Sequence, residues 1–135
     1  ARAEEINERF NPECFVCDPS EPAYILQLRS IGAHVIPAIN EIRLGIEKVQ
    51  ERLRVQADGR ARLFLYDGAL VEVDTSLRAT FKPTSTADEF GVYAYPEGKD
   101  GRPIKEEPVK MYDHGCDCVR YAVMYMDAQM GWSRG

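Results

Sequence analysis

The last part of the chain holds the residues best suited to metal chemistry. Residues 112–125 read YDHGCDCVRYAVMY, and the apolar spacing behind this polar head predicts a helix from Asp113 to about Gln129. His114 and Asp117 stand three residues apart and therefore share one face of that helix. Carboxylate oxygens suit Mg²⁺ and one imidazole is compatible with Mn²⁺, so this face is a candidate divalent-metal site.

The same residues also fit a purely structural role. Asp113 is placed to be the N-cap, where its carboxylate would accept backbone N–H groups of the first turn. Gly115 is expected to leave the surface beside His114 and Asp117 open, at a cost in helix propensity. The alternative to a metal site is therefore a capped helix start carrying a solvated histidine and aspartate. Arg120 is expected to be an ion-pair partner rather than a catalytic group.

A second carboxylate lies far upstream, at the end of an apolar strand predicted for residues 14–17. Asp18 follows that strand directly, and the carboxyl ends of parallel strands are where open α/β sheets place their ligands. Taken alone, Asp18 is also a good turn former or helix cap. Ligands from separated elements are what Mg²⁺ or Mn²⁺ needs, so Asp18 joins His114 and Asp117 as a candidate metal ligand.

The elements that must position these residues alternate between strand and helix. The pattern predicts a helix over 4–10, a strand over 14–17, a helix beginning near Pro22 with Ser20 as its cap, a strand over 33–36, and a helix capped by Asn40 whose apolar stripe is Ile42, Ile46, Val49 and Leu53. This order is a βαβα unit with parallel strands, so the fold class is α/β.

The pattern changes after residue 59. We expect a third strand over 62–66, and residues 69–81 fit either a hairpin partner or a helix, of which we favour the helix. Residues 82–110 read as an irregular excursion with an edge strand at 92–95. At 135 residues the chain is one domain, 1–135.

The composition excludes few classes of function. The net charge is −5, which gives no sign of a nucleic-acid binder overall, although a metal site brings its own positive charge. No apolar run approaches the roughly 20 residues that span a bilayer, so we expect no membrane. Basic residues gather in segment 41–62 and are candidates for DNA binding: Arg43, Lys48, Arg52 and Arg54, followed by Arg60 and Arg62. The alternative is a solvated helix face balanced by glutamates.

Four cysteines leave a zinc site and buried thiols as alternatives. Cys14 and Cys17 have the spacing of a metal knuckle, and Cys116 and Cys118 add a second pair. Residues three apart on a strand point to opposite faces, and residues two apart on a helix are about 200° apart. We therefore favour core thiols in a reducing compartment.

Two motifs resemble the nuclease domain of the large terminase subunit of tailed bacteriophages. The first is CDPSEP at residues 17–22, followed by a helix and by VIPA at 35–38. The second is DHGCDCVRYA at residues 113–122, similar to the family's DHxxDALRYA. The strand expected at 62–66, the helix after it and YAY at 93–95 follow the family's order, so the resemblance covers nearly the whole chain.

The resemblance implies a ribonuclease H-like fold and metal-dependent cleavage of double-stranded DNA. Asp18 matches the family's second catalytic aspartate, Asp117 the third, and His114 a histidine that contributes to metal binding in some members. Two Mg²⁺ or Mn²⁺ ions would lie roughly 4 Å apart in the intact domain. The implied partners are DNA, the portal and the small terminase subunit, in the cytoplasm of an infected or lysogenic bacterial host.

One part of the family pattern has no counterpart here. The first catalytic aspartate of the family lies on an opening strand, and no such apolar run precedes Asp18. The fold is therefore expected to be a partial ribonuclease H-like one, the carboxyl-terminal portion of the nuclease domain. We expect weak or no nuclease activity from it alone, and self-association through the edge beside residues 14–17. The alternative function is a non-catalytic docking or assembly module of the packaging motor.

Overall fold

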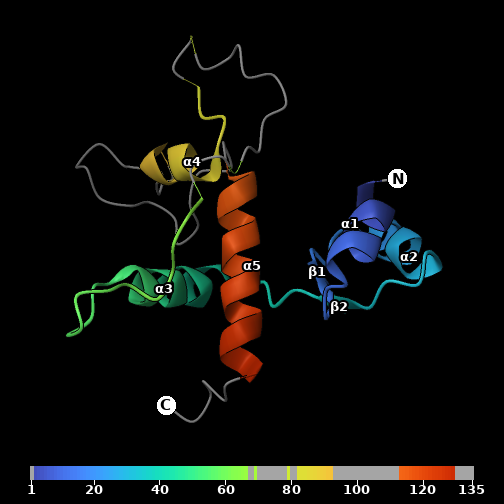
Figure 1. Ribbon diagram of the computed structural model, residues 1–135, viewed down its shortest axis with the longest axis horizontal. Helices are drawn as coiled ribbons and strands as arrows, with labels where there is room; N and C mark the ends of the chain where they lie inside the picture. The colour runs from blue at the N-terminus through green and yellow to red at the C-terminus, as the bar shows by residue number, and fades with distance from the viewer. Residues whose placement is uncertain (1, 67–68, 70–78, 80–81, 93–112, 130–135) are drawn as a thin grey trace. The chain divides into compact units, whose positions relative to one another are not determined.

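The structure is a computed structural model that describes residues 2–66, 69, 79, 82–92 and 113–129 (Figure 1). These residues form a mixed α/β arrangement with five helices and a small two-stranded sheet. The chain divides into two compact units, residues 1–40 with 124–135, and residues 41–123. Each unit is described by itself, because the structure does not define their placement relative to each other.

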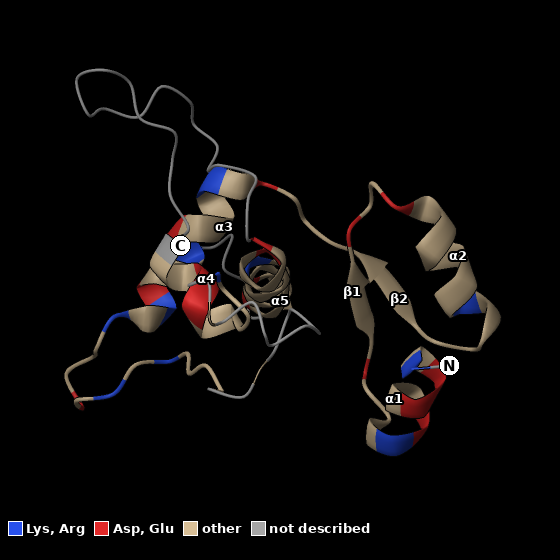
Figure 2. Ribbon diagram, turned by 90° about the horizontal axis from the view of Figure 1, so that it is seen from above, with Lys and Arg blue, Asp and Glu red and all other residues tan. Residues whose placement is uncertain are grey.

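The observed elements follow the predicted order in the first half of the chain. They are α1 (Arg2–Phe10), β1 (Phe15–Cys17), α2 (Pro22–Ser30), β2 (Val35–Pro37), α3 (Ile42–Leu53), α4 (Thr86–Val92) and α5 (His114–Gln129). The acidic side chains Glu4 and Glu5 lie in the first turn of α1 and Arg9 in its last, the arrangement that a helix dipole favours (Figure 2). The strand–helix–strand–helix prediction for residues 14–53 is confirmed.

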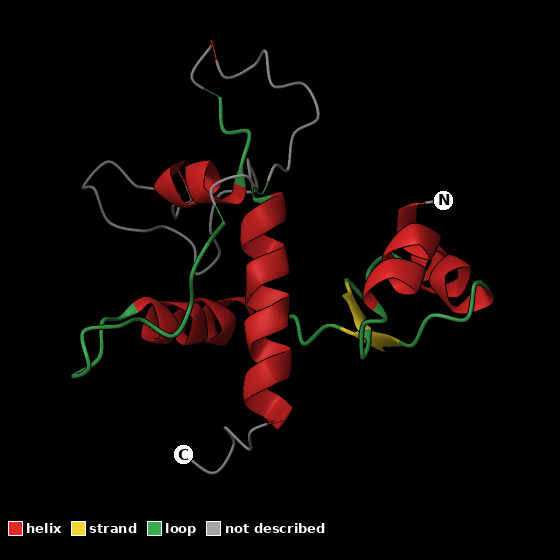
Figure 3. Cartoon of the chain, in the orientation of Figure 1, coloured by secondary structure: helices red, strands yellow, loops and turns green. Residues whose placement is uncertain are grey.

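The first unit is built on the parallel pair β1–β2, drawn yellow in Figure 3. Phe15 lies opposite Val35 and Cys17 opposite Pro37. The connecting helix α2 is ended by Gly32, whose φ of 86° is left-handed and therefore suited to glycine. The core of this unit contains Ile25, Ala33 and Val35, with Phe15, Cys17, Leu28 and Ile31 packed against it.

The outer edge of β2 is closed to further strands. The Val35 carbonyl points away from β1 and accepts a hydrogen bond from Arg29 Nη2 at 3.3 Å. Pro37 has no backbone N–H to offer a neighbouring strand. These two features protect one side of the sheet from unwanted pairing.

In the second unit, α4 begins with a reciprocal cap. Ser85 Oγ accepts the backbone N–H of Asp88 at 3.2 Å, and Asp88 Oδ2 accepts the N–H of Thr84 at 3.3 Å. This exchange is the capping-box arrangement shifted by one residue, and it satisfies backbone donors that the helix leaves unpaired. Thr84 and Ser85 are both buried, so the cap belongs to the interior of the unit.

Several expectations for the chain after residue 53 are corrected. Residues 62–66 form no strand. The predicted irregular excursion over 82–110 contains the regular helix α4, and Val92 ends that helix rather than starting an edge strand. The remainder of the 92–95 prediction, and all of the 69–81 prediction except residues 69 and 79, lie outside the described residues.

The predicted helix caps also differ from those observed. Glu21 and Glu41 occupy the N-cap positions of α2 and α3, and neither makes a side-chain capping bond. Ser20 and Asn40 each lie one residue too early to fill that role. In α2, Pro22 occupies the first turn, where its missing N–H costs nothing.

Among the described helices, none is both long and apolar enough to cross a bilayer.

The four cysteines lie in three different environments. Cys116 is buried, Cys14 and Cys17 are half-buried, and Cys118 is exposed, so the core prediction is wrong for Cys118. Burial raises the pKa of Cys116 to about 12, and the nearby carboxylates of Glu89, Asp117 and Asp113 add to the shift. Since the folded pKa lies above the unfolded value, the stability that this neutral thiol contributes is complete below about pH 9 and declines as the pH rises toward 12.

The thiol environments predict selective alkylation. At about pH 8, iodoacetamide should modify Cys118 at least roughly tenfold faster than Cys116, because the thiolate is the nucleophile and burial suppresses it. Peptide mass spectrometry after timed quenching measures both rates in one sample. In concentrated guanidinium the two rates should converge, and equal rates in the folded chain would contradict the burial of Cys116.

Candidate functional site

The first turn of α5, which carries the predicted ligands, is held by a buried carboxylate from α4. Glu89 Oε2 accepts the backbone N–H of Gly115 at 2.6 Å and that of Cys116 at 3.1 Å. Glu89 is 2 % exposed. A negative side chain at these positions satisfies two unpaired donors and faces the positive end of the helix dipole. The pair of charge-assisted bonds therefore fixes where α5 begins.

The hydrogen bonds to the first turn assign to Glu89 the capping role that was expected of the Asp113 carboxylate. Asp113 does stand at the N-cap position and is buried, and its carbonyl accepts the N–H of Asp117 at 2.8 Å. The carboxylate on the N–H groups of the first turn, however, is that of Glu89. A cap from a neighbouring helix ties two elements together, which a cap from Asp113 alone would not do.

Gly115 is needed for close packing, and the surface beside it is not open as expected. A Cβ built on Gly115 would meet Thr86 Oγ1, and it would lie 2.9 Å from both Glu89 Oε2 and Thr86 Cβ. Real Cβ atoms do not approach neighbours this closely, so only glycine lets α4 reach the backbone of α5. The space beside Gly115 is filled by Thr86 and Glu89.

Asp117 is held by an ion pair within its own helix. Arg120 Nη2 lies 3.2 Å from Asp117 Oδ1, and the two side chains are 4 % and 17 % exposed. The guanidinium carbon of Arg120 also lies 4.9 Å from the centroid of the Tyr121 ring. The structural role expected for Arg120 is confirmed. Its pairing orients the Asp117 carboxylate, which remains partly accessible, while His114 one turn earlier is exposed.

Asp18 has the geometry of a turn former. Its Oδ1 accepts the N–H of Ser20 at 2.9 Å and its carbonyl accepts the N–H of Glu21 at 3.3 Å, which closes the turn from β1 into α2. It is half-buried. Asp18 belongs to the first unit and Asp117 to the second, so their meeting at a shared metal stays a prediction.

The residues nearest Asp117 offer hard oxygen donors without a finished metal site. Glu89, Asp113 and Asp117 all lie close enough to Cys116 to influence its thiol. Across the described residues, no three histidine, cysteine, aspartate or glutamate side chains are grouped as metal ligands. Glu89 is committed to the helix start, so the donors that fit a divalent cation on this turn are Asp117 and His114.

The candidate DNA-binding residues on and just after α3 differ in whether they form ion pairs with glutamates. Arg43 Nε lies 3.6 Å from Glu47 and Lys48 Nζ lies 3.8 Å from Glu51, so the solvated, balanced face is the better description of that part of the helix. Arg54 follows α3, is exposed, and makes no ion pair with the described residues. The uncompensated positive charge therefore lies beyond the helix rather than along it.

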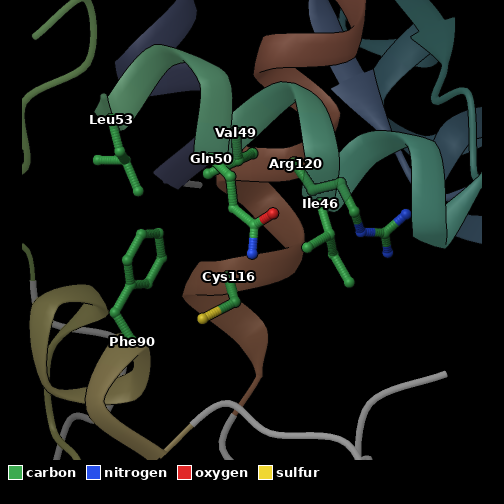
Figure 4. A pocket seen from close by; sticks show the side chains of 7 residues that line it. All are labelled: Ile46, Val49, Gln50, Leu53, Phe90, Cys116 and Arg120. Atoms are coloured by element: carbon green, nitrogen blue, oxygen red, sulfur yellow. The ribbon is translucent and has the colours of Figure 1, made fainter. Parts of the chain in front are cut away.

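A small cavity lies beside the first turns of α5. Its volume is about 200 Å³, and it lies among α3, α4 and α5 (Figure 4). It is lined by Ile46, Val49, Gln50, Leu53, Phe90, Cys116 and Arg120. The lining is mostly apolar, and Arg120 is already paired with Asp117. This cavity therefore does not supply ligands for a cation.

Sequence reasoning missed Glu89, the residue that holds the site in place. One signal was available: Ser85 followed three residues later by Asp88 is a capping pattern, and it marks a helix start inside the segment expected to be irregular. With that helix in place, the pairing of Glu89 with a glycine 26 positions later still depends on tertiary structure.

Replacing Gly115 by alanine should destabilise the second unit. The added methyl group meets Thr86 and Glu89, and forcing α4 away should cost about 1–3 kcal/mol. Gly91 is the matched control, because a Cβ there meets nothing within 4 Å and alanine is the better helix former. Urea unfolding followed by circular dichroism measures both. Equal effects of G115A and G91A would contradict the close approach.

The substitution Glu89→Gln tests the cap itself. The amide keeps the size of the side chain but loses its charge, so we expect a loss of about 2–3 kcal/mol in the free energy of unfolding. Glu47→Gln on the exposed face of α3 is the control and should change stability by less than about 0.5 kcal/mol. A neutral effect of E89Q would show that the carboxylate is not needed at the helix start.

Comparison of the chain with protein-family models, with curated proteins and with solved structures finds no match. The features of the chain that bear on function are the motifs around Asp18 and Asp117 and the contacts that hold the first turn of α5.

Proposed function

We propose that this chain is part of a DNA-packaging terminase of a tailed bacteriophage or prophage, from its metal-dependent nuclease domain. The observation that carries the proposal is the first turn of α5. A buried carboxylate fixes its start, a buried arginine orients Asp117, and Asp117 and His114 remain accessible on one face. A rigid turn with accessible ligands is what a catalytic metal site requires.

The ribonuclease H-like fold belongs to the same proposal. The parallel pair β1–β2 with its connecting helix α2, and the long helix α5 that carries Asp117, are in the order that such a fold needs. Support also comes from Asp18, which stands at the carboxyl end of β1 on the edge where α/β sheets bind ligands.

The proposed roles follow from the chemistry of each side chain. Asp18 and Asp117 would hold Mg²⁺ or Mn²⁺ through carboxylate oxygens, and His114 would favour Mn²⁺ at one position. When bound, such ions activate water and neutralise the charge on the phosphate of the substrate. Arg120 keeps the Asp117 carboxylate in one orientation. The proposed partners are double-stranded DNA, the portal and the small terminase subunit, in the cytoplasm of the bacterial host.

Manganese binding tests the proposal directly. Titration calorimetry with MnCl2 should detect binding to the chain, and Asp117→Asn should weaken it at least roughly tenfold through the loss of a charged ligand. The asparagine keeps an oxygen for Arg120, which limits any change in folding. Asp127→Asn is the matched control, because it removes the same charge from the far part of the same helix.

Nicking of supercoiled plasmid in Mn²⁺ is the companion measurement. We expect weak or no cleavage by the chain alone. If the unchanged chain bound no Mn²⁺ at millimolar concentration, the nuclease assignment would fail and a docking or assembly role would replace it. Strong cleavage that D117N abolishes would instead overturn the expectation that the chain is inactive alone.

A further inference from the structure

The segment after α3 presents one row of exposed side chains. From residue 60 to residue 66 the burial alternates strictly, with the odd residues half-buried and the even ones exposed. The exposed members are Arg60, Arg62, Phe64 and Tyr66. Phe64 and Tyr66 are 77 % and 79 % exposed, the highest values among the exposed large hydrophobic side chains that the structure describes. The backbone bends at Arg62. Alternation with period two places Phe64 and Tyr66 on one side of the backbone that follows this bend.

Backbone hydrogen bonds hold the start of this row against the end of α3. Arg62 N–H donates to the carbonyl of Arg52 at 2.7 Å, and Gln56 N–H donates to the carbonyl of Arg60 at 2.9 Å. The turn between them is closed at Gly59, whose φ is 78°. The exposed aromatic rings therefore project from a backbone that is fixed at its base.

The positive charge of this segment is not balanced. Asp58 pairs with Arg62, with Oδ2 at 3.0 Å from Nη2. Arg54 and Arg60 are exposed and make no ion pair with the described residues. Figure 2 shows this segment as a run with several blue stretches and little red, although the chain as a whole carries −5. The sign of the local field selects an anionic partner.

We propose that the row Arg60, Arg62, Phe64 and Tyr66 binds single-stranded nucleic acid. Residues two apart on an extended backbone are about 6.6 Å apart, at 3.3 Å per residue. That is close to twice the roughly 3.4 Å between stacked bases, so one base fits between the rings of Phe64 and Tyr66. Arg60 and Arg62 precede the two rings along the same segment, so they would meet phosphates on one side of that base. Aromatic stacking next to cations is the usual way to bind unpaired strands.

A duplex fits the row less well than a single strand. Bases inside a duplex are already stacked and paired, so the rings of Phe64 and Tyr66 would find no free face. A protein strand laid over the row would cover the rings, but it would leave the charge of Arg54 and Arg60 uncompensated. The combination of exposed rings and unbalanced arginines therefore favours an unpaired nucleic-acid strand.

This inference goes beyond the proposed function and does not depend on it. The row contains none of the candidate metal ligands, and its binding requires no cation. A packaging nuclease would encounter unpaired bases where a DNA end frays or where a cut has just been made. The row belongs to the same unit as Asp117.

Fluorescence anisotropy with a labelled thymidine dodecamer, in EDTA and low salt, tests the inference on the full chain. Phe64→Ala and Tyr66→Ala should each weaken binding roughly tenfold through the loss of stacking. Arg60→Gln should reduce the slope of log K against log salt by about 0.7. Phe10→Ala is the matched control, because Phe10 is a 65 % exposed ring beside Arg9 in the other unit, and its loss should leave affinity unchanged.

Each outcome of this experiment decides the inference. Affinity that falls for F64A and Y66A but not for F10A supports it, provided that the unlabelled single strand competes better than its duplex. No binding at low salt, equal effects of F10A, or a preference for duplex would overturn it. So would light scattering that shows the rings holding two copies of the chain together. Because EDTA removes metals, a chain that binds the dodecamer but not Mn²⁺ would lose the nuclease assignment and keep this surface.

Discussion

The second unit depends on one carboxylate in the right place. Glu89 accepts two backbone N–H groups at the start of α5, and it does so while almost fully buried. A buried charge is costly unless it is paired and hydrogen-bonded, and the two amides together with the helix dipole provide that compensation. The same contact sets the position of His114 and Asp117, because they lie in the turn that Glu89 holds. The glycine at 115 supplies the room that this close approach of Glu89 needs.

Asp117 shows how a structural contact and a chemical role can coexist in one side chain. Its pairing with buried Arg120 would by itself describe an ordinary intrahelical salt bridge. Yet a metal ligand also needs a fixed orientation, and the guanidinium of Arg120 supplies one to Asp117. The same ambiguity holds for Asp18, whose Oδ1 closes the turn after β1. In both cases the contacts describe how the carboxylate is held, and metal binding is a separate property.

Periodicity predicted the regular parts of the chain well and the irregular parts poorly. The apolar stripe of α3 and the alternation of strand and helix over residues 14–53 were sufficient, because these elements are held by contacts close in sequence. Residues 62–66 have the alternation of a strand but form none among the described residues, since a strand requires a partner that periodicity cannot provide. The helix α4 was missed because threonine, proline and charge around it resemble a loop. Glu89 was missed because its partners lie in another element, and no local pattern indicates such a pair.

The blocked edge of β2 has a consequence for how copies of the chain can aggregate. With the Val35 carbonyl occupied by Arg29 and no amide hydrogen on Pro37, a further strand can be added only beside β1. A sheet that can extend in one direction only cannot propagate as a filament, because filament growth needs two complementary edges on every subunit. Any association through this sheet would therefore stop at a closed pair, and proline and arginine on the far side act as terminators of polymerisation.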